Sequence, residues 1–382
     1  MVYILDATLR EGEQTPGVYF DIHIKMAIAN LLNQIGVDYI EAGHPAVSDE
    51  IRNAISHIAH MNTHAKIGAH TRSIQNDVDQ AINCNVQFLG IFYCVSNGRL
   101  DEIHNKSLTH AIENITKTID YARQRNPDLI IRYTPEDTVR TDFENVIKAS
   151  TAAIEAGANI ISIADTTGYM IPGTRNNMYD YVFRFKSRLQ EIGLQPMIAV
   201  HCHNDRGFAL ANAIDGYRAG AEILDASILG LGERAGIVDL AQLLVTLHAD
   251  FQEKTSWKLH LLPELYSLVS RFTGIPIPVN FPIIGKNAFT HCAGIHTHAA
   301  TINPIHYQSI NPSIVGRKTE ICLDNMAGLS SVKFMLKQNR ISADHDLAVK
   351  VLNEVKHVGR KGRIVNDDEL RYIVTMCKQQ KD

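Results

Sequence analysis

The sequence has no surplus of positive charge and no long apolar run. Its 37 lysines and arginines are outnumbered by 41 aspartates and glutamates, which gives a net charge of −4 over 382 residues. Charge-driven binding of nucleic acid or of an acidic membrane surface needs a basic surplus, so we expect neither partner. A helix that crosses a bilayer needs about 18 or more consecutive apolar residues, and no such run occurs.

Cysteine is scarce, and no two cysteines form a C-x-x-C pair. The six are Cys84, Cys94, Cys202, Cys292, Cys322 and Cys377. This scatter fits reduced thiols better than a disulfide framework or a cysteine–zinc knuckle. The chain also begins directly with a strand-like run, without a basic and apolar leader. We therefore expect a cytoplasmic protein.

Short, β-branched apolar runs alternate with segments of helical length. The predicted strands cover residues 2–5, 37–43, 65–70, 88–94, 130–135, 160–166, 197–203 and 222–230. Their apolar residues are mostly continuous, which is typical of parallel strands buried on both faces. The intervening segments 21–36 and 143–159 carry apolar residues at helical spacing, and glycine stands at or near their ends, as at a helix C-terminus.

Eight such strand–helix units in about 250 residues predict a (β/α)₈ TIM barrel. The alternative is a doubly wound open sheet, but its dinucleotide-binding motif G-x-G-x-x-G is missing from the first turn, ATLREGEQTPG. Three prolines in GIPIPVNFPIIG, at 274–285, mark the end of the barrel. We predict a barrel domain at 1–273, a linker and lid subdomain at 274–325, and a small helical subdomain at 326–382.

Polar residues follow the apolar runs at the predicted strand ends. In a TIM barrel these ends meet at one mouth, where active sites lie. The residues expected there are Arg10, Glu11, His70, Arg132, Thr134, Glu136, Asp165, Thr166, His201 and His203.

The spacing of His201 and His203 indicates a metal site. Residues i and i+2 of a strand point to the same face, so both imidazoles face one way. With Glu11 from another strand they make a three-ligand site that leaves positions open for substrate. The alternatives are histidines that only form hydrogen bonds, and a Glu11 that only pairs with Arg10. Both features at the same end of a barrel favour the metal.

An arginine within the apolar run IIRYTP must meet an anion. That anion is a carboxylate of the protein or one of the substrate. Arg132 together with Arg10 favours a substrate with more than one anionic group, and the alternative is an ion pair of Arg132 with Glu136 or Asp137.

Two further motifs say little about function when taken alone. GLGERAG, at 230–236, is by default a tight turn, and HCAGIHTH, at 291–298, a surface loop.

These residues resemble the acyl-CoA condensing branch of the DRE-type TIM-barrel metalloenzymes. The branch includes the homocitrate, 2-isopropylmalate and citramalate synthases. The matching motifs are LDATLREGEQ, ADTTG, HCHNDRG, GLGERAG and KNAFTHCAGIH, which occur in the family's order over about residues 3 to 325. The resemblance implies an acyltransferase that condenses acetyl-CoA with a 2-oxo acid. It also implies a homodimer in which the region after the barrel reaches over the partner's active site.

The resemblance also implies roles for single residues. Glu11, His201 and His203 would hold a divalent metal, which the sequence leaves open among zinc, manganese, magnesium and cobalt. Arg10 would stabilise the developing alkoxide. The base that removes the acetyl-CoA proton would comprise Glu136, His296 and Tyr307, the last two across the dimer. Substrate would contact Arg10, His70, Arg132, Thr134 and Thr166, and acetyl-CoA would contact Gly230, Gly232, Glu233 and Gly236.

Three details favour 2-oxoglutarate, and hence a homocitrate synthase. The opening motif reads Arg-Glu-Gly, as in lysine-pathway homocitrate synthases, and Ile237 follows GERAG where 2-isopropylmalate synthases usually have asparagine. His70, Arg132 and Thr134 match the residues that bind the distal carboxylate of 2-oxoglutarate in the family. An apolar substrate pocket would also leave the buried Arg132 without compensation for its desolvation. Gly90 and Ala199 occupy positions where lysine-pathway relatives carry acids linked to lysine binding, so we expect no lysine inhibition. The alternatives are a 2-isopropylmalate synthase acting on 2-oxoisovalerate, a citramalate synthase, a lyase or aldolase of the same superfamily, and a non-catalytic binding relative.

Overall fold

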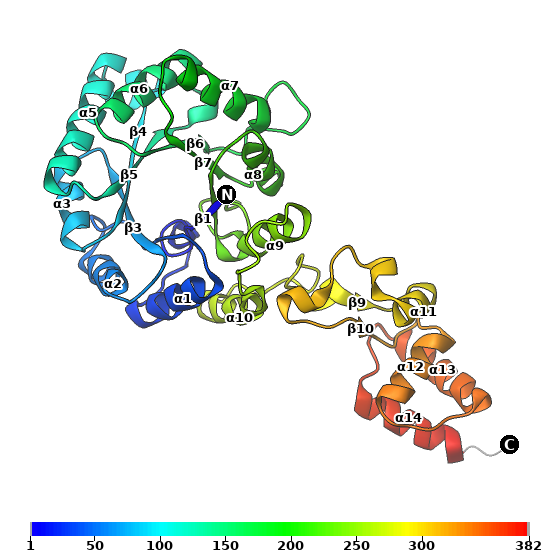
Figure 1. The fold of residues 1–382 in the computed structure, drawn as a ribbon. Coiled ribbons are helices and arrows are strands. Elements are labelled where there is room, and N and C mark those ends of the chain that lie inside the picture. Colours follow the sequence, from blue (N-terminus) through cyan, green and yellow to red (C-terminus); the bar gives the residue numbers. More distant parts are fainter. Residues whose placement is uncertain (1, 380–382) are drawn as a thin grey trace. The chain divides into compact units, whose positions relative to one another are not determined.

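Eight parallel strands close into a barrel, as the sequence predicts. The computed structural model describes residues 2–379, and Figure 1 looks into the ring of strands. Each strand pairs with the next along the chain, and β8 pairs with β1. The strands are β1 (Tyr3–Asp6), β2 (Tyr39–Glu41), β3 (Lys66–Arg72), β4 (Phe88–Cys94), β5 (Ile130–Glu136), β6 (Ile160–Asp165), β7 (Met197–Cys202) and β8 (Ile223–Ala226).

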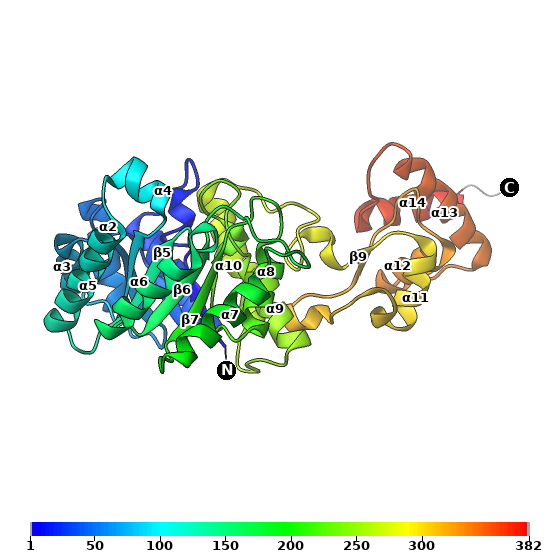
Figure 2. The same cartoon turned by 90° about the horizontal axis from the view of Figure 1, so that it is seen from above.

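Helices surround the barrel, and Figure 2 shows several of them beside the strands in a view from above. They are α1 (Ile22–Ile35), α2 (Asp49–Ala59), α3 (Gln75–Asn83), the short α4 (Asn97–Arg99), α5 (Leu108–Arg125), α6 (Phe143–Glu155), α7 (Met178–Glu191), α8 (Ala209–Arg218), α9 (Leu240–Asp250) and α10 (Leu262–Thr273). Local sequence sets their ends. The side chain of Asp21 caps α1, which stops at Gly36 with φ 103°, a conformation that glycine adopts at little cost.

Apolar side chains fill the end of the barrel at which the strands begin. Leu5, Phe88, Ile160, Ala199 and Ile223 belong to one buried cluster there. The polar ends of the strands therefore stay at the other end of the barrel, as in other TIM barrels. The main error in strand length is at 222–230, where β8 stops at Ala226 and Leu229 turns with φ 60°.

The described residues form two compact units, which meet at Pro276 and Ile277. The predicted domain bounds at 273 and 325 stay predictions. The second unit has a small parallel ladder of β9 (Thr290–His291) and β10 (Glu320–Ile321), and the helices α11 (Gly294–Ile302), α12 (Leu329–Gln338), α13 (His345–Gly359) and α14 (Asp367–Gln379).

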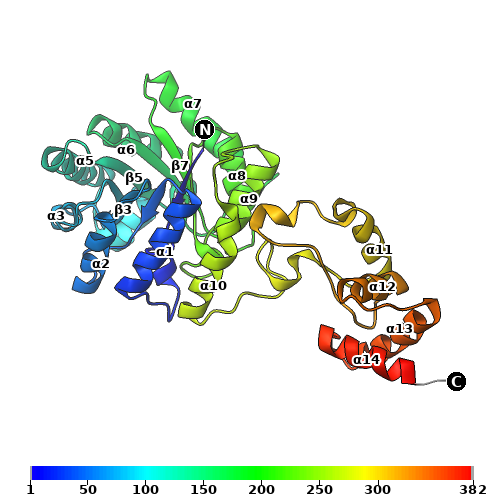
Figure 3. The same cartoon turned by 60° about the horizontal axis from the view of Figure 1, so that its bottom comes forward.

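The second unit has a hydrophobic core of its own. Figure 3 shows α12, α13 and α14 side by side, and Val332, Val351, Val355, Leu370 and Val374 are buried between them. Throughout the described residues, no helix combines the length and the apolar character needed to cross a membrane.

Candidate active site and metal centre

Glu11, His201 and His203 come together at the mouth of the barrel. Their donor atoms lie within 4.8 Å of one another, and all three residues are buried. Glu11 follows β1, His201 lies near the end of β7, and His203 follows that strand directly. The strand-end and i, i+2 arguments therefore located the cluster correctly.

The charge states of Glu11 and His203 suit a divalent cation. Burial opposes ionisation of Glu11, but Arg10, the two histidines and the backbone N–H of Glu233 together outweigh it and lower the pKa of Glu11 to about 2. Burial and the neighbouring His201 lower the pKa of His203 to about 3, so its ring is neutral. The Nε2 atoms of the two histidines face each other at 3.3 Å. One carboxylate and neutral imidazole nitrogens are metal donors, so the residues fit such an ion.

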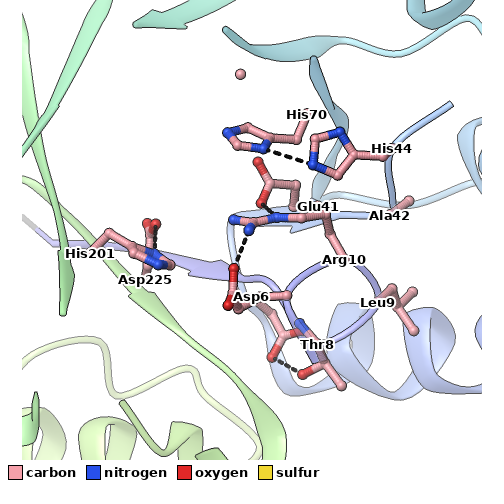
Figure 4. Close-up of polar contacts among 12 residues, drawn as sticks. Asp6, Thr8, Leu9, Arg10, Glu41, Ala42, His44, His70, His201 and Asp225 are labelled. Carbon is pink, nitrogen blue, oxygen red and sulfur yellow. Dashed lines mark hydrogen bonds and ion pairs between the residues drawn. The ribbon is translucent and has the colours of Figure 1, made fainter. Parts of the chain in front are cut away.

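Asp225 orients His201, and sequence reasoning missed it. Oδ2 of Asp225 lies 2.9 Å from Nδ1 of His201. Figure 4 shows this contact. This contact places the proton on Nδ1 and leaves Nε2 free as a donor atom toward the cluster, an arrangement common to metal-binding histidines. The signal for Asp225 in the sequence was a carboxylate inside the apolar run ILDASILG, at 223–230.

Asp225 also pairs with Arg132. The two Oδ atoms accept hydrogen bonds from both terminal nitrogens of Arg132, at 2.9 and 2.6 Å, and Ser162 accepts another at 2.6 Å. The anion that the buried arginine requires is thus a carboxylate of the protein. The alternative pairing of Arg132 with Glu136 or Asp137 is wrong. The premise that an apolar substrate would leave the buried charge of Arg132 without a partner is also wrong, because Asp225 is that partner.

Arg10 lies between two carboxylates. Its Nε donates to Glu41 at 2.6 Å, and a terminal nitrogen donates to Glu11. Burial disfavours the charged guanidinium, but Glu41 and Glu11 outweigh it and raise the pKa of Arg10. A guanidinium has five donors, so this charged group keeps further N–H groups for a ligand. Glu41 ends β2, a strand end at which the sequence prediction named no residue.

A cavity of about 270 Å³ opens beside these groups. Its lining includes the predicted residues Arg10, Glu11, His70, Arg132, Thr134, Glu136, Thr166, His201, His203 and Glu233. It also includes residues that the sequence prediction did not name, among them Gln14, His44, Phe92 and Arg234. Asp165 is instead fully buried, and it accepts hydrogen bonds from the backbone of Tyr169 and Met170.

Neutral histidines form one wall of the cavity. Nδ1 of His70 lies 3.3 Å from Nε2 of His44, and Figure 4 shows the contact between these two rings. The ring of Phe92 stacks on His70. Burial and the charge of Arg10 lower the pKa of both, that of His44 to about 4. Beside them Thr134 has a buried hydroxyl without a partner within the described residues. This wall offers uncharged hydrogen-bonding groups.

The expected base residues fall in both units. In the barrel unit, Arg99 forms an ion pair with the partly exposed Glu136. In the second unit, the rings of His296, on α11, and Tyr307 lie with their centroids 4.3 Å apart. The pair of Arg99 and Glu136 thus lies within the barrel unit, and the pair of His296 and Tyr307 lies within the second unit.

The GLGERAG loop packs against the metal donors. The backbone N–H of Glu233 donates to Glu11 at 3.1 Å. A Cβ at Gly232 would lie 3.0 Å from Cγ of Glu11, and one at Gly236 would collide with the carbonyl of Gly230. These glycines therefore allow a close approach that fixes Glu11; a role in binding acetyl-CoA stays a prediction.

Comparison with known proteins identifies the family. Residues 1–269 match the HMGL-like family, and residues 283–363 match the homocitrate synthase post-HMGL domain-like family. The chain belongs to the HMGL-like family. The homocitrate synthase of Pyrococcus horikoshii is 42% identical over 353 residues, which cover 92% of this chain and 94% of that protein. A probable 2-isopropylmalate synthase of Ignicoccus hospitalis is 35% identical over all of this chain and 93% of that protein.

Solved structures of HMGL-like proteins share the fold. The HMG-CoA lyase of Bacillus subtilis has a TM-score of 0.61 and 24% identity, over 72% of this chain and 95% of that one. The predicted family and the predicted enzyme class are confirmed by these matches taken together.

Acid should weaken the HMGL-like barrel in part through His44. Its ring has a pKa of about 4 in the folded chain against about 6.5 when unfolded, so between these values the unfolded chain binds more protons. The stability that His44 contributes should be nearly complete above pH 6.5, and it should fall by about 3 kcal/mol as the pH drops to 4. Urea unfolding at both pH values should show a smaller loss for His44→Gln than for wild type. An equal loss of stability in wild type and in His44→Gln would contradict the prediction. The control is His57→Gln, which changes an exposed histidine and should lose as much stability as wild type.

Proposed function

We propose that this protein condenses acetyl-CoA with a 2-oxo acid, and that the acid is 2-oxoglutarate, which makes the product homocitrate. The observation that carries the condensation is the cluster of Glu11, His201 and His203 with Arg10 beside it, in a barrel of this family. The homocitrate-synthase match of residues 283–363 supports the proposed product.

The metal cluster would hold a divalent cation, which, when bound, acts as a Lewis acid on the carboxylate and keto oxygens of the 2-oxo acid. Arg10 is fixed by Glu41 and Glu11 and donates its remaining N–H groups to the keto oxygen. Its positive charge stabilises that oxygen as it becomes an alkoxide. Because both partners hold the guanidinium in place beforehand, little reorganisation is needed during the reaction.

Glu136, His296 and Tyr307 would remove the proton from the methyl group of acetyl-CoA. The carbanion equivalent then attacks the keto carbon, a new carbon–carbon bond forms, and the alkoxide takes up a proton. Water finally cleaves the thioester and releases CoA. We further propose that a homodimer brings His296 and Tyr307 of one subunit to the barrel of the other. Arg99 supports this scheme because its ion pair fixes the side chain of Glu136, which lines the cavity.

The cavity wall supports a dicarboxylic substrate. The neutral rings of His44 and His70 and the unpartnered hydroxyl of Thr134 can donate to a distal carboxylate. Arg132 lines the same cavity, and its charge is shared with Asp225. The wall has no room for a carboxylate side chain at position 90, because a Cβ on Gly90 would lie 2.7 Å from the ring of His70. This supports the proposal that lysine does not inhibit the enzyme.

A second candidate is a 2-isopropylmalate synthase. The paired Arg132 favours it, because Asp225 satisfies the arginine without any substrate carboxylate. Phe92 and Ala164 also give the cavity apolar surface, which would suit the branched chain of 2-oxoisovalerate. The relative of Ignicoccus hospitalis carries that name.

The deciding experiment follows CoA release with a thiol reagent. Acetyl-CoA and a divalent metal are supplied with 2-oxoglutarate, 2-oxoisovalerate or pyruvate, one at a time. Release with 2-oxoglutarate alone would establish homocitrate formation. Release with 2-oxoisovalerate would establish the second candidate, and no release with any 2-oxo acid would overturn the condensation.

Thr134→Val should change KM for 2-oxoglutarate and KM for 2-oxoisovalerate to different extents. Valine has the same shape but no hydroxyl, so a distal carboxylate loses one hydrogen bond, which to a charged group contributes about 1.5–3 kcal/mol. KM for 2-oxoglutarate should rise roughly 10- to 100-fold, whereas KM for 2-oxoisovalerate should stay nearly constant. Steady-state kinetics with both acids tests this, and equal changes would remove Thr134 from the distal subsite. Thr151→Val is the control, because Thr151 also has a buried hydroxyl but does not line the cavity.

A further inference from the structure

We propose that Cys292, Cys322 and Asp324 form a second metal site, which binds a thiophilic divalent cation of the zinc class. Among the described residues, they make up a donor cluster separate from Glu11, His201 and His203, with all donor atoms within 4.8 Å of one another. The proposal does not depend on the reaction that the barrel catalyses. No short sequence motif indicates the site, because the two cysteines are 30 positions apart (322 − 292).

The β9–β10 ladder brings the thiols together. The strands pair in parallel with Ile321 opposite His291, and the backbone N–H of Cys322 donates to the carbonyl of His291 at 3.0 Å. Cys292 and Cys322 therefore leave the two strands side by side (Figure 1 shows β9 beside β10). Residue i+2 of an extended segment faces the same way, which places Asp324 with Cys322.

The environment of the thiols favours a cation. The thiols of Cys292 and Cys322 lie beside the carboxylate of Asp324. One oxygen of Asp324 accepts a hydrogen bond from the backbone of Met326 at 2.7 Å, which fixes the carboxylate and leaves its second oxygen for a ligand. All three residues are only partly buried, so an ion can reach them from solvent.

The donor set selects the metal. Thiolates bind soft or borderline ions such as Zn²⁺ and are poor ligands for Mg²⁺ and Ca²⁺. Around tetrahedral Zn²⁺, with bonds of about 2.0–2.3 Å, neighbouring donors lie about 3.3–3.8 Å apart, so small side-chain rotations would close this cluster on the ion. Two sulfurs and one oxygen leave the fourth position for water.

The ion would stabilise a weak part of the second unit. Each strand of the ladder has only two residues, and so short a ladder is marginal by itself. A bound ion would fasten β9 to β10 and hold the chain just before α11, the helix that carries His296. The expected role is therefore structural.

Cadmium reports this site selectively. Cd²⁺ bound to thiolate gives an ultraviolet charge-transfer band, whereas the barrel cluster contains no sulfur and is silent. Full-length protein, reduced and freed of metal by a chelator, should show the band and saturate at one Cd²⁺ per chain. Cys322→Ser should abolish the band, and Asp324→Asn should weaken binding at least about tenfold. Cys84→Ser is the matched control, because serine can keep the hydrogen bonds of that buried thiol.

A second measurement needs no variant. Zn²⁺ should protect two of the six thiols of the wild-type protein from a thiol reagent. The proposal is overturned if the band is absent, if it survives Cys322→Ser, or if Zn²⁺ protects no thiol. It is also overturned if mass spectrometry finds Cys292 and Cys322 joined as a disulfide and the reduced protein binds no Cd²⁺.

Discussion

Glu11→Ala should remove the catalytic metal and nearly all condensing activity. Glu11 is the one carboxylate of the barrel cluster, and two imidazoles alone hold a divalent cation poorly. Lewis-acid assistance contributes several kcal/mol to such reactions, so kcat should fall about 1,000-fold or more. Elemental analysis after dialysis should show the metal content falling in parallel with the rate.

Two further variants serve as comparisons for Glu11→Ala. His203→Ala should behave like Glu11→Ala, because it removes a second donor of the same cluster. Glu144→Ala, which changes an exposed glutamate on α6, should leave both metal content and rate unchanged. Normal metal content with lost activity in the Glu11 variant would move this residue out of the ligand set.

Asp225→Ala should damage the protein in two separable ways. It leaves the buried charge of Arg132 without its partner, and removal of one member of a buried ion pair costs about 3–5 kcal/mol of stability. It also frees Nδ1 of His201, and loss of such an orienting carboxylate weakens metal binding about 10- to 100-fold. Urea unfolding of metal-free protein measures the first effect, and competition with a chromophoric chelator measures the second.

A double variant distinguishes the two effects. Adding Arg132→Met to Asp225→Ala removes the unpaired charge, so stability should largely recover while metal affinity stays low. Ser162→Ala is a mild control, since it removes one hydrogen bond of Arg132 and leaves His201 untouched. If the double variant regained both properties, Asp225 would act on the metal only through Arg132, and its role at His201 would be disproved.

The prediction of the site failed where the partners come from distant strands. Arg132 on β5 was correctly expected to meet an anion, but β5 and β8 are not neighbours in the sheet, so no register argument could pair it with Asp225. The proximity of Cys292 and Cys322 was missed for a similar reason. A short ladder brings them together, and the pairing of its two strands cannot be predicted from their spacing in the sequence.

By itself the sequence determined the barrel, its eight strands and the metal cluster, because these depend on local patterns. Continuous apolar runs specify buried parallel strands, and strand ends converge wherever a parallel barrel closes. Only the tertiary structure decided which carboxylate meets each buried cation. A buried charge takes whichever partner the closed barrel brings within reach, and in this protein Asp225 serves both Arg132 and His201 while Glu41 and Glu11 share Arg10.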